Sequence, residues 1–213
     1  MQRYFADSKI TTEYQLTPEI YKHAIKVLRM KVGDAFELVD DAEVVHKMEI
    51  TKIEDGKAEA TSVEVIPSDV ELPSNVTIAC GISKNDKADW IVQKGTEMGA
   101  TKFIFFIGDY SVAKWDRKRS SKKVQRLQKI ARSAAEQSHR TKIPEVTFVE
   151  KLKDIDFEKN DARIVAYEES AKKGESGNLF KILNKKKSPI LGIFSYWKLI
   201  FYSAFLEAYT LYP

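Results

Sequence analysis

Arg132-Ser-Ala-Ala-Glu-Gln-Ser-His-Arg-Thr-Lys-Ile-Pro-Glu-Val146 ends a long basic segment whose apolar residues have the spacing of a helix. One helical face carries mostly small side chains, at Leu127, Ile130, Ala131, Ala134, Ala135 and Ser138. Side chains this small let another backbone approach closely, and Pro144 does not permit further helix. We therefore predict a helix from about Arg117 to His139 with a tightly packed face.

A polar cluster lies at the end of this predicted helix. Glu136, Gln137 and Arg140 are about one turn apart, and Glu136 with Arg140 forms an i,i+4 pair that contributes about 0.2–0.5 kcal/mol. The cluster is either an ordinary ion pair at a helix end or a functional carboxylate–amide–guanidinium group. From Lys114 to Lys142 the chain has 11 Lys and Arg residues and two acidic residues, so the segment has a strong positive field.

The composition indicates a folded, soluble protein. Its 213 residues are 43% apolar and 31% charged, which fits one large domain or one large and one small domain. The N-terminus, Met1–Asp7, becomes polar at once, so we expect no secretory signal. Cys80 is the single cysteine, which excludes an internal disulfide and a cysteine metal cluster, and the expected compartment is the reducing cytoplasm.

The net charge of +4 conceals an asymmetry between the two parts of the chain. Residues 1–72 contain 9 basic and 15 acidic side chains, a net charge of −6, whereas residues 73–213 contain 26 and 16, a net charge of +10. A polyanion such as nucleic acid would therefore bind the second part, with a salt-dependent affinity.

The first 70 residues have the pattern of one helix followed by short strands. Thr17-Pro18-Glu19 is typical of a helix start, and Gly33-Asp34 ends this helix. The period then changes to two, and Asp55-Gly56 predicts a hairpin turn. The predicted strands span 35–39, 44–53 and 57–66. We expect a small β-barrel-like domain over residues 1–70, followed by a linker at about 67–74.

From Val76 onward, strands and helices alternate. This pattern predicts a mostly parallel sheet with ligand chemistry at the carboxyl ends of its strands, in a domain that spans 73–213. The predicted strands span 76–82, 103–107, 146–149, 163–167 and 190–194, and the predicted helices span 86–98, 117–139 and 179–183.

Missing motifs exclude several chemistries. The turn after the first of these strands, Gly81-Ile-Ser-Lys84-Asn-Asp-Lys87, has one glycine, whereas dinucleotide and ordinary methyl-donor sites have a glycine-rich turn. The sequence has neither a P-loop nor a Gly-x-Ser-x-Gly motif. His23, His46 and His139 lack the spacing of metal ligands, so we expect no metal.

Two further clusters have both a structural and a functional interpretation. Arg3 and Arg29 lie among apolar neighbours, where an arginine either forms a structural pair or binds phosphates and bases. Lys84 and Lys87 belong to a strand-to-helix turn that is either a solvated loop or a binding site.

Taken together, these motifs resemble the RsmE family of SPOUT-class methyltransferases. Each motif is weak by itself, whereas the set is specific because it follows the family order over about residues 1–170. The matching motifs are Met1-Gln-Arg-Tyr-Phe5, His23-x-x-x-Val-Leu-Arg-Met30-x-x-Gly-Asp34, Lys84-x-Asp86, Gln93-Lys-x-Thr-Glu-Met-Gly99, Ser111-Val-x-Lys114, Ala134-Ala-Glu-Gln-Ser-x-Arg140-x-x-x-Pro144-x-Val146 and Ala166-Tyr-Glu168.

The resemblance implies a fold and an activity. The fold would be a PUA-like β-barrel RNA-binding domain at 1–70, followed at 73–213 by an α/β, Rossmann-like SPOUT domain with a trefoil knot. The activity would be methylation of N3 of a specific uridine in 16S rRNA of the small ribosomal subunit, with S-adenosylmethionine as methyl donor and no metal. A cytoplasmic homodimer without membrane attachment would carry it out.

The resemblance also implies roles for individual residues. Arg140 would stabilise the uracil anion or an RNA phosphate in catalysis, and Glu136 and Gln137 would orient it. Side chains bordering the donor pocket would be Tyr167 and Glu168, and those holding RNA would be Arg3, Arg29, Lys84 and Lys87.

After Pro189 the resemblance stops. The family continues with Gly-Pro-Glu-Gly-Gly and later Leu-Gly-x-Arg-Ile-Leu-Arg-x-Glu-Thr-Ala, which form the knot and the donor pocket. This chain instead has eight aromatic residues and two charges, Lys198 and Glu207, in its last 26 residues. We therefore expect an incomplete knot and an impaired donor pocket, as after a shifted reading frame or a truncation. The alternative function is a non-catalytic RNA-binding protein that has lost the donor pocket.

Overall fold

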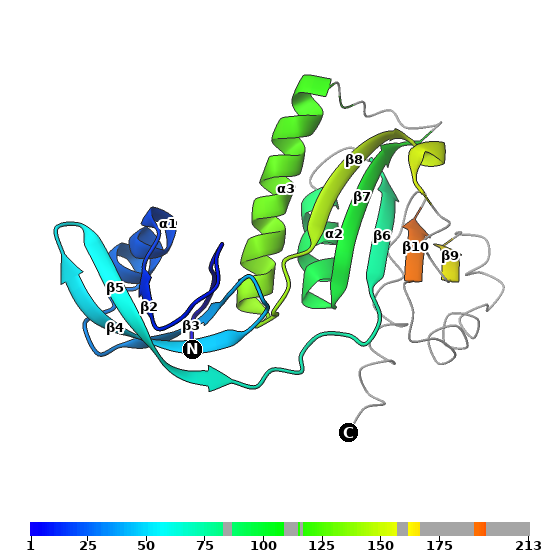
Figure 1. Cartoon of the computed structure of the whole chain (residues 1–213). Helices are drawn as coiled ribbons and strands as arrows, with labels where there is room; N and C mark the ends of the chain where they lie inside the picture. The colour runs from blue at the N-terminus through cyan, green and yellow to red at the C-terminus, as the bar shows by residue number, and fades with distance from the viewer. Residues whose placement is uncertain (83–86, 109–114, 116, 157–161, 167–189, 195–213) are drawn as a thin grey trace. The chain divides into compact units, whose positions relative to one another are not determined.

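The structure is a computed structural model in which the chain separates into two compact units (Figure 1). It describes residues 1–82, 87–108, 115, 117–156, 162–166 and 190–194. The first unit contains Met1–Glu71 and the short segment Glu136–Lys142, and the second contains Leu72–Ala135 and Ile143–Pro213. Lys84, Tyr167, Glu168, the predicted helix at 179–183 and the tail after 194 lie outside the described residues.

The first unit is built on a five-stranded mixed sheet with the order β1-β3-β4-β5-β2. Its strands are β1 (Arg3–Phe5), β2 (Glu13–Gln15), β3 (Ala35–Val39), β4 (Val45–Glu54) and β5 (Lys57–Ile66). Only β1 and β3 pair in parallel. The three strands predicted from alternation are confirmed, whereas β1 and β2 were missed because three residues do not establish a period of two.

Local sequence explains the turn and the helix start of this unit. Asp55 and Gly56 both have positive φ, +48° and +75°, as the tight hairpin turn between β4 and β5 requires. The Thr17 hydroxyl accepts a hydrogen bond from the Ile20 amide at 3.3 Å, which caps α1 (Pro18–Tyr21). The helix continues as a π-helix, η1 (Lys22–Val27), where the sequence predicted ordinary α-helix.

The core of the first unit lies between the sheet and this helix. Large side chains of β3 and β4 are fully buried there, and Ala24 of η1 packs among them without exposed surface. Its members include Tyr4, Ile20, Phe36, Leu38, Met48 and Ile50. The closure of the sheet into a barrel stays a prediction.

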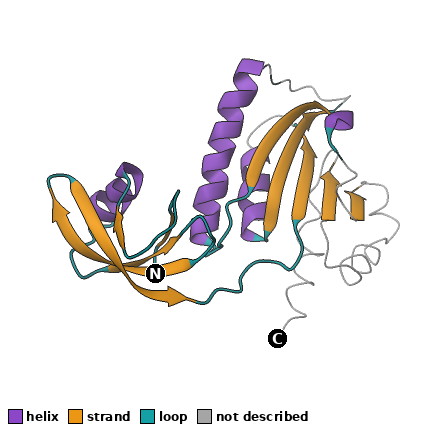
Figure 2. Ribbon diagram, viewed as in Figure 1, coloured by secondary structure: helices purple, strands orange, loops and turns teal. Residues whose placement is uncertain are grey.

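The second unit is built on a five-stranded parallel sheet with the order β8-β7-β6-β10-β9, as the strand–helix alternation predicted (Figure 2). Its strands are β6 (Val76–Gly81), β7 (Ala100–Ile107), β8 (Glu145–Lys151), β9 (Ala162–Ala166) and β10 (Ile190–Phe194). Its helices are α2 (Lys87–Glu97), α3 (Arg117–Gln137) and the short 3-10 helix η2 (Leu152–Asp154).

Alternate strand residues divide the core of this unit between the two faces of the sheet. On one face, Phe103 and Phe105 pack in the same buried cluster as Val92 of α2 and as Leu127 and Ala131 of α3. The opposite face carries a smaller cluster of Ala79, Phe106 and Ile155. Ala134 and Ala135 of α3 are also buried, so the predicted stripe of small residues is a packing face.

Two further features concern a thiol and the helices. Burial raises the pKa of the Cys80 thiol to about 12, so this thiol stays protonated and unreactive. Within the described part of the chain, no helix combines the length and the apolar character needed to cross a membrane.

The close contact between α2 and β7 gives a test of this packing. A Cβ atom added to Gly95 of α2 would lie 2.6 Å from Cε1 of Phe103, which is fully buried. We expect Gly95→Ala to lower the free energy of unfolding in urea by about 1–3 kcal/mol, as overpacking does. Alanine favours helix by about 1 kcal/mol over glycine, so equal or greater stability of the variant would show that the contact is absent. Gly81→Ala, where the nearest atom is 3.7 Å away, is the control.

Candidate functional site

The parallel sheet of the second unit brings the carboxyl ends of its strands to one edge. The strand order reverses between β6 and β10, because the chain runs from β6 outward to β7 and β8, whereas β9 and β10 lie on the other side of β6 (Figure 1). Ligands of open α/β sheets bind outside the carboxyl ends of the strands at such a reversal. Cys80 of β6, Phe194 of β10 and Ala166 of β9 lie in register there.

Several predicted site residues follow the strands that end at this edge. Tyr167 and Glu168 come directly after Ala166, and Lys84 comes shortly after Gly81, although all three lie outside the described residues. Lys87 is described, is exposed and begins α2. In sequence, the predicted donor and RNA residues therefore follow β6 and β9, two strands whose carboxyl ends meet at this edge.

The predicted catalytic residue Arg140 lies in the first unit and is almost fully buried, with 3% of its surface exposed. Its Nε atom donates to Oε1 of Glu71 at 3.2 Å, and Nη2 donates to Oε2 of the same carboxylate. Oε1 also accepts the backbone amides of Thr141 and Lys142, at 2.9 and 3.2 Å. Glu71 therefore holds three consecutive residues of the returning segment.

Arg3, predicted to hold RNA, is likewise buried in the first unit, with 4% exposed. Its Nε donates to Oε2 of Glu37 at 2.7 Å, and its Nη1 donates to the carbonyls of His139 and Arg140. Nδ1 of His139 lies 3.0 Å from the same Glu37 oxygen. These contacts correspond to the structural-pair interpretation of Arg3, and RNA binding by this residue stays a prediction.

Glu136 and Gln137 stand at the end of α3 with more access to solvent. Gln137 is exposed and Glu136 is half-buried. Burial and the negative charge of Glu136 raise the pKa of Tyr4 to about 12, so its hydroxyl stays protonated beside Nδ1 of His23, 2.9 Å away. Arg29 is also exposed, at a left-handed φ of 58° just after η1.

The two carboxylates that organise this segment were not identified from the sequence. Glu71 lies in the predicted linker between Pro67 and Pro73, where no periodicity indicates an acid with a structural partner. Glu37 alternates along β3 as an ordinary polar residue would. The one available signal was the position of Arg3 among apolar neighbours, where a buried charge requires a partner.

The electrostatic balance around both carboxylates is similar. Burial pushes the pKa of Glu71 up, but the hydrogen bond and charge of Arg140, with the amides of Thr141 and Lys142, leave it below its usual value. Burial acts in the same way on Glu37, and Arg3 and His139 again lower its pKa below the usual value. Both groups therefore stay ionised at neutral pH.

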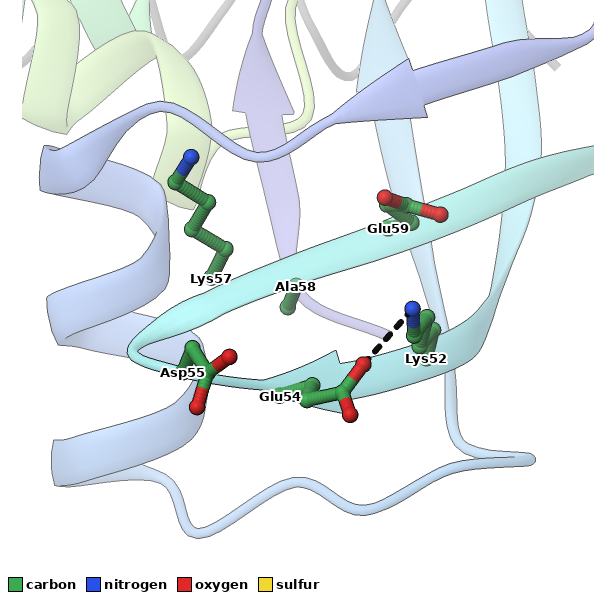
Figure 3. Close-up of a pocket in the computed structure, with 6 residues that line it drawn as sticks. All are labelled: Lys52, Glu54, Asp55, Lys57, Ala58 and Glu59. Atoms are coloured by element: carbon green, nitrogen blue, oxygen red, sulfur yellow. Dashed lines mark ion pairs between the residues drawn. The ribbon is translucent and has the colours of Figure 1, made fainter.

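A hollow of about 220 Å³ opens on the β4–β5 hairpin (Figure 3). Lys52 and Glu54 form an ion pair of 2.7 Å beside it, and Ala58 is its one apolar residue. Its lining consists of Lys52, Glu54, Asp55, Lys57, Ala58 and Glu59. The charges largely neutralise one another, so the hollow offers little to select a ligand. Among the described residues, no group of three His, Cys, Asp or Glu side chains is arranged to hold a metal.

Comparisons with known proteins agree with the two-unit architecture. Residues 70–194 match the model of an RNA methyltransferase domain, and residues 16–61 match that of an RNA methyltransferase PUA domain. A ribosomal RNA small subunit methyltransferase E of Bacillus subtilis (strain 168) is 38% identical over 206 residues, which covers 91% of this chain and 79% of the relative.

Two further relatives show the same similarity. A ribosomal RNA small subunit methyltransferase E of Buchnera aphidicola subsp. Acyrthosiphon pisum (strain APS) is 31% identical over 66% of this chain and 55% of its own length. A solved structure of a ribosomal RNA small subunit methyltransferase E from Neisseria gonorrhoeae, bound to S-adenosyl methionine, superposes with a TM-score of 0.75 at 25% identity. That superposition covers 98% of this chain and 86% of the other.

The lowered pKa of Glu71 predicts a pH dependence of stability. A carboxyl whose pKa is lower in the folded state stabilises the fold above its unfolded pKa of about 4.3, and this contribution is lost as the pH falls through the folded pKa. At pH 6, Glu71→Gln leaves the Arg140 charge buried without its partner, and we expect a loss of about 3 kcal/mol in urea unfolding. The difference from the unmodified chain should shrink toward pH 3.

The exposed Glu49 on β4 supplies the matched control. Glu49→Gln should leave both the stability at pH 6 and its pH dependence nearly unchanged. A constant difference between Glu71→Gln and the unmodified chain from pH 6 to pH 3 would contradict the assignment of an ionised Glu71.

Proposed function

This chain belongs to the RsmE family of ribosomal RNA small subunit methyltransferases, and we propose that it transfers the methyl group of S-adenosylmethionine to N3 of a specific uridine in 16S rRNA. The observation that carries the proposal is the 38% identity to the Bacillus subtilis methyltransferase, which extends over 91% of the chain and so includes both units. The donor is supported by the Neisseria gonorrhoeae relative, which was solved with S-adenosyl methionine bound.

The sheet of the second unit fits such a donor. The reversal between β6 and β10 leaves the carboxyl ends of both strands open to connections that run in opposite directions, which is where this class of fold binds nucleotide-like ligands. Tyr167 and Glu168 would border the donor, since they follow β9 at that edge. The donor supplies an electrophilic methyl group on a sulfonium, and the departing product is the neutral thioether.

The remaining chemistry belongs to the RNA and to side chains of the protein. The target uracil must leave its stack so that N3 can be reached, and a base must take the N3 proton as the nitrogen forms its bond to carbon. Negative charge then develops on the ring, and a positioned guanidinium stabilises it. We assign that role to Arg140, with Glu136 and Gln137 to orient it.

The burial of Arg140 sets a condition on this assignment. Its guanidinium is bound to Glu71 in the described chain, so contact with RNA requires the side chain to leave that carboxylate. Gln137 reaches solvent without any change. Arg3 and Arg29, with Lys84 and Lys87, would hold the RNA, and of these Arg29 and Lys87 are exposed.

The PUA-type first unit is proposed to hold the RNA during this reaction, and a homodimer in the cytoplasm is the proposed form of the enzyme. The knot of the family would involve the chain after β9, which lies largely outside the described residues. A second candidate is a non-catalytic RNA-binding protein. It is favoured by the sequence after β10, which lacks the Gly-Pro-Glu-Gly-Gly motif of the family.

Two measurements separate these functions. Calorimetric titration with S-adenosylmethionine should show one site per chain, and incubation with unmethylated small subunits should yield N3-methyluridine on nucleoside analysis of the 16S rRNA. No heat of binding at millimolar donor, combined with retained RNA binding, would instead establish the non-catalytic protein.

The roles in the polar cluster are tested by single-turnover methylation. Gln137→Ala should lower the rate at least about tenfold, as loss of a positioning group does, while the unfolding free energy stays within about 0.5 kcal/mol. Arg140→Ala should lower both the rate and the stability, since it leaves the half-buried Glu71 carboxylate without its guanidinium partner. Gln125→Ala, at an exposed position of the same helix, is the control. An unchanged rate in Arg140→Ala would show that the central assignment is wrong.

A further inference from the structure

Helix α3 presents a dense row of cations to solvent. Between Arg117 and Gln137 it contains eight Lys and Arg residues and one acid, Glu136. The exposed members are Arg119, Lys122, Lys123, Arg126 and Lys129. We call these five residues the basic ridge.

The basic ridge follows one side of the helix. At 3.6 residues per turn its five positions fall within an arc of about 120°, and the buried Leu127 and Ala131 lie beyond that arc on the core side. From Arg119 to Lys129 the ridge extends about 15 Å along the axis, at 1.5 Å per residue. The five positive charges therefore form a row along the helix axis on one side of α3.

This arrangement opposes the stability of the helix itself. The first turn of α3 contains no acid and begins with Arg117-Lys-Arg, although negative charge is what stabilises a helix N-terminus. Pairs such as Lys122 with Arg126 and Arg119 with Lys123 place like charges at i,i+4, which is destabilising. Residues that destabilise their own secondary-structure element occur mainly at functional sites.

Contacts within the second unit fix part of the ridge and leave part of it unneutralised. Both terminal nitrogens of Arg126 donate to the two carboxylate oxygens of Asp89 at 2.6 Å, and Nζ of Lys123 lies 4.9 Å from the ring centre of Trp115. Within the described chain, no acidic side chain pairs with Lys122 or Lys129. A polyanion could therefore supply the missing counter-charge at these two positions.

We propose that the basic ridge binds the phosphodiester backbone of RNA, as a surface additional to the residues that the family motifs single out. The identity of the polyanion rests on the proposed function. The Asp89–Arg126 pair joins the first turn of α2 to the middle of the ridge, and the exposed Lys87 begins that turn. Lys87 therefore lies two residues from a side chain that contacts the ridge, at the start of the helix that follows β6.

The apolar side of α3 argues for RNA over an anionic membrane. A helix that lies on a membrane inserts an apolar face between the lipid headgroups. The apolar face of α3 is already buried against the sheet through Leu127 and Ala131, and no large exposed apolar side chain is described on this helix. A surface with charge alone suits a phosphate backbone.

The test uses the full chain and a fluorescein-labelled RNA hairpin that contains the 16S rRNA uridine of the proposed function, with binding followed by fluorescence anisotropy. Lys122→Gln combined with Lys129→Gln should weaken binding about tenfold at 0.1 M salt. The slope of log Kd against log salt should fall by about 1.4–1.8, since each lost phosphate contact removes about 0.7–0.9. The melting temperature of this variant should be equal or higher, because like charges are removed.

The matched control is Lys151→Gln combined with Lys153→Gln, which removes the same charge from two exposed positions of the second unit that lie outside the ridge. This control should leave the salt slope unchanged. The proposal would be overturned if the ridge variant had the same salt slope as the unmodified chain, or if the ridge and control variants lost the same RNA affinity. It would also be overturned if the unmodified chain did not bind the hairpin. Binding of the unmodified chain to phosphatidylserine vesicles that the ridge variant loses would assign the ridge to membranes instead.

Titration with S-adenosylmethionine keeps the two proposals apart. The ridge variant should bind the donor as the unmodified chain does, because the ridge lies on helix α3 and none of its residues belongs to the predicted donor edge. If the unmodified chain binds no donor while the ridge variant still loses RNA affinity, the methylation proposal fails and the ridge proposal stands.

Discussion

The half-buried carboxylate of Glu71 holds the place where the chain leaves the first unit against the segment by which it returns. The chain leaves the first unit at Glu71, returns to it at Glu136 and leaves again after Lys142. Glu71 accepts hydrogen bonds from the Arg140 side chain and from the amides of Thr141 and Lys142. One carboxylate therefore connects the two places where the chain leaves the first unit, after Glu71 and after Lys142. Desolvating this charge is unfavourable unless its lone pairs are satisfied, and these donors do so. The end of α3 is thereby held in the first unit.

The ion pairs of this segment give a structural role to the arginines that the family motifs single out. Arg3 and Arg140 were predicted to contact RNA or the reacting base, and in the described chain both are buried in ion pairs that shape the segment next to Gln137. Arginine serves both purposes with the same planar fork of donors, so its chemistry alone cannot separate them. A residue that positions a site and a residue that contacts substrate can share one motif.

Helix α3 combines two conflicting requirements. Its small side chains bury one face against the sheet, which stabilises the second unit, whereas its outer face places like charges next to one another and next to a helix N-terminus. Packing outweighs the electrostatic cost in the free protein, because burial of an apolar face is the larger contribution to helix stability in a folded domain. The same face that weakens the helix is suited to a polyanion.

The sequence by itself determined the parallel α/β sheet, the hairpin at Asp55-Gly56, the cap at Thr17 and the packed face of α3, because periodicity, turn chemistry and capping are local properties. The ordered motifs also led to the methyltransferase family. Only the tertiary structure showed that β10 lies between β6 and β9 and that η1 is π-helical. It also showed the hydrogen-bonded ion pairs of Glu37 with Arg3 and of Glu71 with Arg140. Glu71 is 69 positions from Arg140, and Glu37 is 34 positions from Arg3 and 102 from His139. A carboxylate in a strand or linker has no local sequence feature that indicates so distant a partner.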